Sequence, residues 1–236
     1  MTKTSTVIPT LLTLALLFSS TASVEAGTVH IPGLSGSGLN VQVTSRKEAL
    51  YSTTVPQHYD FSCGSAALAT LLTHHYGTNV TEQELFTWMY EKGEQEKIRR
   101  EGFSLLDMKN CLKAKGFQAD GFYASLDKLA DAGIPAIVLL DLKGYRHFVV
   151  VKGVTDKRVL IGDPASGIKV MKRDDFEEMW NGLVFIIRNR TLLAENNFNR
   201  LDEWRVQGQT PMGSALQMTD LAKVTYLLSG PEGAGP

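Results

Sequence analysis

The stretch Gln57-His-Tyr-Asp-Phe-Ser-Cys-Gly64 runs directly into the apolar segment Ser65–Leu72, which has the composition of a buried helix. This order places Cys63 in the first turn of that helix, with the side-chain amide of Gln57 a few residues upstream. A helix N-terminus stabilises a thiolate, because its unpaired N–H groups and its dipole favour negative charge. Since the thiolate is the reactive form of cysteine, the stretch indicates a nucleophile presented at a helix start.

Two later segments supply the other groups that such a nucleophile needs. His147 opens the apolar run His147-Phe-Val-Val-Val, and Asp163 ends the run Val159-Leu-Ile-Gly-Asp163. A histidine can stabilise a thiolate as an imidazolium and then protonate a leaving amine. Asp163 would accept a hydrogen bond from the far nitrogen of His147, and the Gln57 amide would join the Cys63 backbone N–H as oxyanion donors. Each residue alone has an ordinary structural explanation, but together they predict a cysteine hydrolase.

The distribution of helix and strand signals predicts an α+β fold. Helices are expected first, over 63–76, 81–92, 104–116 and 125–131, with the capping box Thr81-Glu-Gln-Glu84 opening the second. Strands follow, over 135–140, 147–154, 158–162, 168–171 and 183–188, interrupted by a helix over 174–180. A nucleophile helix packed on an antiparallel sheet that carries the base is the papain-like arrangement.

The ends of the chain differ from this central part. Residues 1–26 have the pattern of a signal peptide, with the short apolar run Leu11–Phe18 and the small-residue site Val24-Glu25-Ala26. Residues 27–45, rich in glycine and serine, are expected to form a flexible lead-in, and residues 46–190 the peptidase domain. Residues 191–236 form a C-terminal extension, with a loose helical stripe over 213–229 and a disordered end over 230–236.

Composition and the missing motifs exclude several functions. The 236 residues carry a formal net charge of −1, without a basic block, so a nucleic-acid partner is not expected. No Walker A loop is present, which argues against ATP, and no Gly-x-Ser-x-Gly elbow, which argues against a serine hydrolase. We expect no cofactor, no metal site and no transmembrane span.

Several individual residues have alternative roles. Cys111 falls on the apolar face of its helix, so a buried inert thiol is favoured over a disulfide with Cys63. His74 is interpreted as a polar-face residue of the first helix, and Trp180 as a core anchor rather than a substrate contact. Asp60 is expected to be structural, capping the first helix through its carboxylate.

At these residues the chain resembles the bacteriocin-processing cysteine peptidases, family 39 of the cysteine peptidases. The shared motifs are Gln57 upstream of Cys63-Gly64, the run His147-Phe-Val-Val150, and the turn Asp163-Pro-Ala-Ser-Gly167. The resemblance implies a papain-like fold and endopeptidase activity, commonly after a double-glycine leader. It implies Cys63 as nucleophile, His147 as base, Asp163 as the residue that orients it, and Gln57 in the oxyanion hole.

The chain departs from many members of that family. Those are domains of ATP-driven exporters, whereas this sequence shows neither a transmembrane region nor an ATPase and has its own export signal. It is similar to a stand-alone secreted branch, represented by the protease encoded alongside functional-amyloid fibre subunits in some Gram-negative bacteria. Phe61–Leu72 and Gly102–Lys109 carry that similarity.

The sequence therefore predicts an exported cysteine endopeptidase that acts in the periplasm of a Gram-negative bacterium. It would cut a protein or peptide through a thioester acyl-enzyme, during maturation or export of secreted fibre components. The partners would be fibre subunits or their export machinery. Two alternatives remain open: a catalytically idle binding or chaperone module, and a cell-wall amidase that uses the same triad.

Overall fold

The computed structural model describes residues 27–31 and 39–206, which form two separate units. In the first unit, the strands β1 (Gly27–Ile31) and β2 (Leu39–Val43) pair antiparallel, so the expected lead-in contains regular strand structure. The second unit begins at Arg46. The expected signal peptide, the helical stripe over 213–229 and the disordered end all lie outside the described residues.

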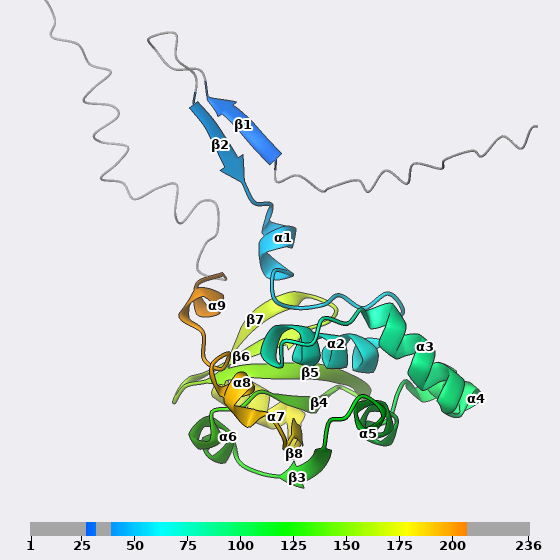
Figure 1. Cartoon of the computed structure of the whole chain (residues 1–236). Coiled ribbons are helices and arrows are strands. Elements are labelled where there is room, and N and C mark those ends of the chain that lie inside the picture. The colour runs from blue at the N-terminus through cyan, green and yellow to red at the C-terminus, as the bar shows by residue number, and fades with distance from the viewer. Residues whose placement is uncertain (1–26, 32–38, 207–236) are drawn as a thin grey trace, which may run out of the picture. The chain divides into compact units, whose positions relative to one another are not determined.

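An antiparallel sheet of six strands is the frame of the second unit, and its strand order is β3-β8-β4-β5-β6-β7 (Figure 1). Every neighbouring pair in it is antiparallel. The bounds are β3 Ala119–Tyr123, β4 Ala136–Leu142, β5 Tyr145–Val154, β6 Arg158–Asp163, β7 Gly167–Lys172 and β8 Trp180–Ile187.

Helices cover both faces of this sheet because its inner strands are apolar on both sides. On β5, Phe148 and Val150 belong to one buried cluster, together with residues of α2 (Cys63–His75). Val149 and Val151 belong to a second cluster, together with residues of α6 (Leu126–Ala132) and α7 (Arg173–Met179). Successive strand residues point to opposite faces, so a continuous apolar run is the pattern of a strand buried on both sides.

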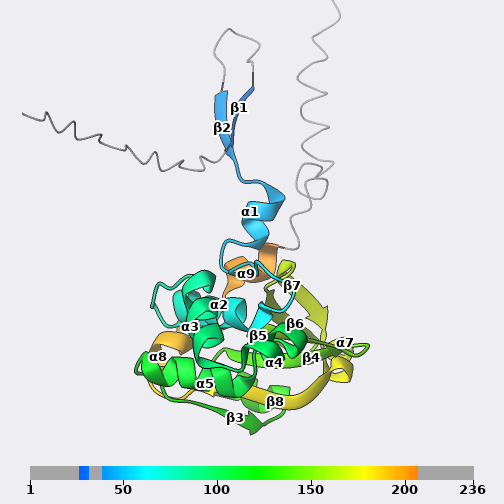
Figure 2. The ribbon, with the colours of Figure 1, turned by 90° about the vertical axis from the view of Figure 1, so that its right-hand side faces the viewer.

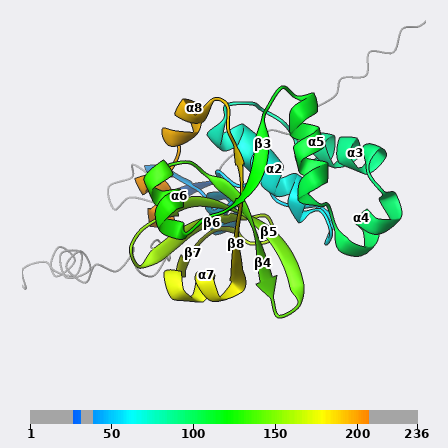
Figure 3. The same cartoon turned by 90° about the horizontal axis from the view of Figure 1, so that it is seen from below.

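The remaining helices lie around α2 and at the ends of the unit. α3 (Glu82–Lys92) contacts both α4 (Gln95–Glu101) and α5 (Leu105–Ala114), as Figure 2 shows, and α1 (Arg46–Leu50) lies against β7. Figure 3 shows α7 across β4, β7 and β8 on the opposite face. Among the residues described, no helix combines the length and apolar character that crossing a bilayer requires.

The α+β prediction is confirmed, with most elements within a few residues of the expected bounds. The predicted capping box forms at Thr81 with Glu84, a second forms at Ser104 with Asp107, and Gly133 ends α6 in the left-handed conformation with φ 63°. Trp180 is buried beside Phe176, their ring centroids 5.5 Å apart, which confirms the core assignment.

Some elements were missed, and β8 begins at Trp180 rather than at residue 183. The helix α4 buries only Ile98, so its sequence has no apolar stripe to reveal it. The edge strand β3 buries only Ala119 and contains Asp120 and Gly121, residues that are depleted in strands. Both α4 and β3 are stabilised by tertiary packing, which the local pattern of apolar and polar residues does not predict.

The described part of the C-terminal extension packs on α2 and on the strand β5. It contains α8 (Thr191–Glu195), which lies against α2, and α9 (Leu201–Val206). Asn199 between them donates its backbone N–H to the Lys152 carbonyl at 2.9 Å and accepts from the Val154 N–H at 2.9 Å. The extension therefore completes the hydrogen bonding of β5 near its C-terminal end.

A buried ion pair fixes the same contact. Lys152 is fully buried, and its Nζ lies 2.9 and 2.8 Å from the two carboxylate oxygens of Glu203. The ammonium also donates to the carbonyl and hydroxyl oxygens of Thr53, at 2.8 and 2.6 Å. Burial lowers the pKa of Lys152, and the Glu203 carboxylate opposes that shift by favouring the charged form. The pair thus joins the extension, the strand β5 and the segment before Gln57.

We predict that Glu203→Gln or Lys152→Met lowers the free energy of unfolding by about 3–5 kcal/mol, because either change leaves one buried charge without its partner. Urea denaturation followed by circular dichroism measures this. The control is Arg188→Gln, which breaks an exposed pair with Asp120 and should cost less than about 1 kcal/mol. Equal, small losses in all three variants would show that the buried pair does not hold the extension in place.

Candidate active site

Cys63 is the first residue of α2 and is buried, with only 6% of its surface exposed. Gly64 follows because the helix start is packed tightly: a Cβ there would lie 3.1 Å from the Cβ of Phe103 and 3.5 Å from the Phe148 ring. The N-cap residue is Ser62, and no side chain caps this helix. The expectation that Asp60 caps it was therefore wrong: Asp60 lies in an exposed turn before the helix, too far upstream for the capping position.

His147 and Asp163 meet across the neighbouring strands β5 and β6. The His147 Nε2 lies 2.7 Å from the Asp163 Oδ1, and both side chains are buried. The turn after β6 orients the carboxylate, because the Ala165 N–H donates to it at 2.8 Å and the Ser166 hydroxyl at 2.7 Å. Gly167 closes the turn with φ 81°, and a Cβ there would lie 2.6 Å from the Leu50 carbonyl oxygen. The turn formed by the Asp-Pro-Ala-Ser-Gly motif thus holds the Asp163 carboxylate in one orientation, toward His147.

The electrostatics of this group favour a charged histidine. Burial alone would lower the pKa of His147, but the hydrogen bond with Asp163, the neighbouring Cys63 sulfur and the charges of both groups outweigh it and raise that pKa to about 9. Burial acts to raise the pKa of Asp163, and the hydrogen bonds from His147 and Ser166 reverse this and lower it. An imidazolium held between a carboxylate and a sulfur is the state required to protonate a leaving amine.

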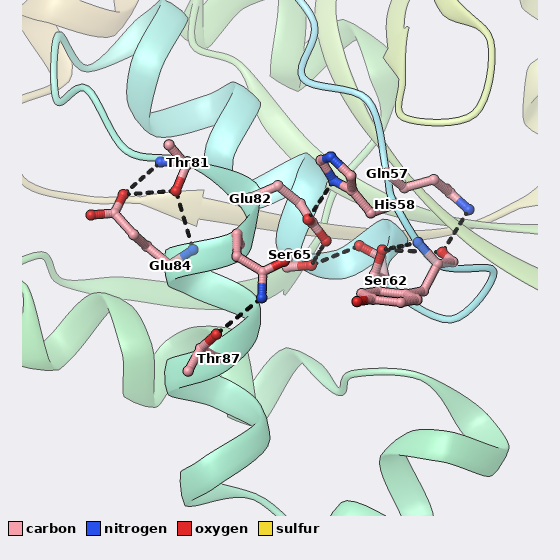
Figure 4. A network of polar contacts seen from close by, with 10 residues as sticks. Gln57, His58, Ser62, Ser65, Thr81, Glu82, Glu84 and Thr87 are labelled. Atoms are coloured by element: carbon pink, nitrogen blue, oxygen red, sulfur yellow. Dashed lines mark hydrogen bonds and ion pairs between the residues drawn. The ribbon is translucent and has the colours of Figure 1, made fainter. Parts of the chain in front are cut away.

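Gln57 is tied to the same turn through its backbone. Its N–H donates to the carbonyl oxygen of Pro164 at 3.0 Å, which places Gln57 next to the residue that follows Asp163. Its side-chain Nε2 donates to the Tyr59 carbonyl at 3.1 Å, and its Oε1 is buried without a hydrogen-bond partner (Figure 4). A primary amide has two N–H donors, so one holds the side chain in place and the second stays available to an oxyanion.

A polar network behind this loop was not expected from the sequence. Glu82, at the start of α3 and only 1% exposed, accepts a hydrogen bond from the His58 Nδ1 at 2.8 Å. Its other oxygen lies 2.8 Å from the hydroxyl of Ser65, which is also 2.8 Å from the Ser62 carbonyl oxygen (Figure 4). His58 follows Gln57 directly, and Ser65 lies on α2 two residues after Cys63. Glu82 therefore connects the loop that carries the amide to the helix that carries the thiol.

The structure excludes the other candidate side chains from the site. Both cysteines are free, and Cys111 is fully buried, where burial raises its pKa to about 11. His74 and His75 lie at the far end of α2; burial and the charge of Lys152 lower the pKa of His74 to about 4 and that of His75 well below its usual value. Within residues 27–31 and 39–206, no three His, Cys, Asp or Glu side chains are grouped as metal ligands.

An open cleft of about 630 Å³ borders Cys63. One wall comes from the β4–β5 turn, where the Tyr145 hydroxyl donates to the Asp60 carbonyl at 3.0 Å and the Tyr145 ring stacks on His147 with centroids 5.9 Å apart. The lining residues are Asp60, Phe61, Cys63, Arg99, Arg100, Glu101, Gly102, Gly144, Tyr145 and Arg146. A peptide in this cleft would pass over the thiol.

Comparison with known protein families identifies the part of the chain that contains this site. The Peptidase C39 family model matches residues 52–191. The chain belongs to the Peptidase C39 family. This confirms the resemblance given by the motifs, and it makes the protein a cysteine peptidase; the matched segment contains Gln57, Cys63, His147 and Asp163.

Two curated relatives and one solved structure are similar to this chain. The chain is 40% identical over 177 residues to the "Probable functional amyloid protease FapD" of Pseudomonas aeruginosa, covering 75% of this chain and 78% of that protein. The Pseudomonas fluorescens protein of the same name is 39% identical, with 74% and 78% covered. The peptidase domain of Streptococcus ComA, a bi-functional ABC transporter, is 28% identical with a TM-score of 0.49, covering 57% of this chain and 96% of that domain.

Of the four side chains named from the sequence, the structure joins His147 to Asp163 and places Cys63 beside them, while Gln57 contacts the turn after Asp163 through its backbone. The sequence reasoning missed the groups that hold these residues. Ser166 belongs to the motif Asp163-Pro-Ala-Ser-Gly167. Its spacing from Asp163 is typical of a turn closed by a side-chain hydrogen bond, so the sequence could have predicted this contact. Glu82 lies between the two capping residues Thr81 and Glu84, where an acidic residue is common at a helix start. The sequence therefore offered no reason to expect that its carboxylate is buried. Tyr145 had no local signal, because its partner Asp60 is distant in sequence.

We predict that His147 titrates near pH 9 in the folded peptidase and that Asp163→Asn lowers this pKa, because the imidazolium then loses a charged acceptor while it stays buried. Nuclear magnetic resonance of the imidazole groups measures both values. His74, with a pKa of about 4, should be unchanged in the variant and is the internal control. A His147 midpoint below its ordinary value in the wild type would contradict the charged state.

We predict that Glu82→Ala lowers the free energy of unfolding by about 1–3 kcal/mol, because the hydrogen bonds that join His58 and Ser65 to α3 are lost and the Ser65 hydroxyl keeps only the Ser62 carbonyl as acceptor. Glu82→Gln, which retains one acceptor oxygen, should lose less. The control is Glu91→Gln on the exposed face of α3, with an expected change within about 0.5 kcal/mol. A neutral Glu82→Ala would mean that the network does not stabilise the loop.

Proposed function

We propose that this C39 peptidase is exported and cleaves a protein partner during the assembly of secreted amyloid fibres, in the periplasm of a Gram-negative bacterium. The observation that carries the catalytic part is the buried His147–Asp163 pair, 2.7 Å apart and in contact with a cysteine at a helix start. The fibre context comes from the FapD relatives, which are named functional amyloid proteases. Export rests on the signal-like pattern of residues 1–26.

The proposed reaction has two half-reactions. The Cys63 thiolate attacks the carbonyl carbon of the scissile bond, and the carbonyl oxygen becomes an oxyanion that accepts from the Gln57 amide and the Cys63 backbone N–H. The first N–H groups of a helix have no partner within it, so the Cys63 N–H is available. As the C–N bond breaks, the His147 imidazolium gives its proton to the leaving amine, and a thioester remains on Cys63.

The second half-reaction releases the other product. Neutral His147 takes a proton from a water molecule, whose oxygen attacks the thioester carbonyl. The C–S bond breaks, the carboxylic acid product leaves, and the Cys63 thiolate and His147 imidazolium are restored. Asp163 keeps its charge throughout; its role is to orient the ring and stabilise its positive form.

We predict that protein N-termini in the periplasmic and secreted fractions of the native host differ between the wild type and Cys63→Ala. New termini present only with the wild type would identify the substrate and the scissile bond together. The matched control is Cys111→Ala, which removes the other thiol and should leave these termini in place. The Cys63→Ala protein should melt within a few degrees of the wild type, since loss of one sulfur costs about 1 kcal/mol or less.

Identical termini with all three proteins, in a host that expresses the fibre components, would contradict the proposed proteolysis. Alkylation then separates an idle site from an active one. Iodoacetamide should modify Cys63 far faster than Cys111, of which only about one molecule in 10⁴ is a thiolate at pH 7. Equal, slow modification would favour a binding module, whereas release of muropeptides from purified cell wall would favour an amidase.

A further inference from the structure

Three arginines line the cleft beside Cys63. Arg99 and Arg100 come from α4 and Arg146 from β5, whereas two carboxylates, Asp60 and Glu101, line the same space. These arginines do not share one environment. Arg99 pairs with Glu96 and donates to the Tyr90 hydroxyl, and Arg100 pairs with Glu101 at 2.6 Å. Among these three arginines, Arg146 alone has no ion pair with a described residue.

Arg146 is exposed and makes no ion pair or side-chain hydrogen bond with any residue that the structure describes. Asp141 lies opposite it in the β4–β5 register, where a cross-strand ion pair could form. The Asp141 carboxylate instead accepts from the Gly144 N–H at 2.6 Å, which closes the turn between the strands. The guanidinium therefore lines the cleft without a hydrogen-bonded partner in the described part of the chain, although its charge also acts on the nearby Glu101 carboxylate, which is paired with Arg100.

The backbone that carries Arg146 is held on both sides. Tyr145 is fixed by its hydrogen bond to the Asp60 carbonyl and by its stacking on His147. His147 is fixed by Asp163. Because Arg146 lies between these two anchored residues, its Cα has a set position relative to the reacting groups, and only its own side chain is free to move.

We propose, on the basis of the function above, that Arg146 binds an acidic side chain of the substrate close to the scissile bond. Neighbouring Cα atoms are about 3.8 Å apart, and an extended peptide advances about 3.3 Å per residue. A long side chain next to His147 thus reaches substrate residues within about three positions of the cleaved bond. Guanidinium and carboxylate match in geometry and form paired, charge-assisted hydrogen bonds.

The two carboxylates of the cleft limit what this subsite accepts. Glu101 is occupied by Arg100, and Asp60 places one negative charge near the thiol. A polyanion would be repelled by Asp60, so the cleft favours a single Asp or Glu at one position rather than an acidic run. The preference should therefore appear at one fixed distance from the scissile bond.

A peptide library prepared from host proteins tests this. The protein is expressed from its full sequence in cells that export it, purified, and incubated with the library. Mass spectrometry identifies the cleaved peptides, and their sequences are then aligned at the cleavage site. The wild type should show Asp or Glu enriched at one position within three residues of the cleaved bond. Arg146→Gln should lose that enrichment, and Arg146→Glu should replace it by Lys and Arg. Arg188→Gln, an arginine outside the cleft lining, is the matched control and should keep it.

A pair of synthetic peptides that differ only by Glu→Gln at the enriched position completes the test. The wild type should cleave the Glu peptide with a kcat/KM about tenfold higher, and Arg146→Gln should cleave both equally. Cleavage without acidic enrichment, or enrichment that persists in Arg146→Gln, would overturn the subsite while leaving the peptidase intact. No wild-type cleavage beyond that of Cys63→Ala would refute the proposed function itself, and the subsite with it.

Discussion

The hydrogen bond between His147 and Asp163 is the constraint on which the rest of the site depends. It joins two neighbouring strands, and it exists only because β5 and β6 pair in one register, with the His at the start of one strand and the Asp at the end of the next. Both groups are buried, so each is costly without the other. Their contact makes a charged imidazole stable beside Cys63, which is the condition for thiol chemistry at neutral pH.

The other parts of the domain position groups around that pair. The turn after β6 aims Asp163 and also anchors the Gln57 backbone through Pro164. Glu82 connects the loop after Gln57 to the nucleophile helix, so amide and thiol are held by one buried carboxylate. At the other end of β5, Lys152 ties the C-terminal segment to the same strand. The catalytic strand is therefore fixed at both ends by buried polar contacts.

In the proposed mechanism, substrate selection and chemistry both depend on the strand β5. Tyr145, Arg146 and His147 are consecutive; Tyr145 forms a wall of the cleft, and the proposals above make Arg146 the cation that binds the substrate and His147 the proton carrier. This arrangement gives the peptidase a way to read a residue of the substrate at a set distance from the bond it breaks. A fibre subunit or an export factor with an acidic residue near an accessible extended segment would fit such a cleft.

The sequence by itself determined the fold class and the starts of the helices α2, α3, α5 and α6, and it predicted the four site residues. Caps, glycines and apolar runs are local signals, and the order Gln57, Cys63, His147, Asp163 follows from their presentation at element ends. Only the tertiary structure decided which groups support them. Glu82 meets His58 and Ser65, Tyr145 meets Asp60, and Glu203 meets Lys152 across long stretches of chain. Such pairs depend on strand order and helix packing. Their members are brought together by the fold and are far apart in the chain, so no fixed spacing in the sequence identifies them.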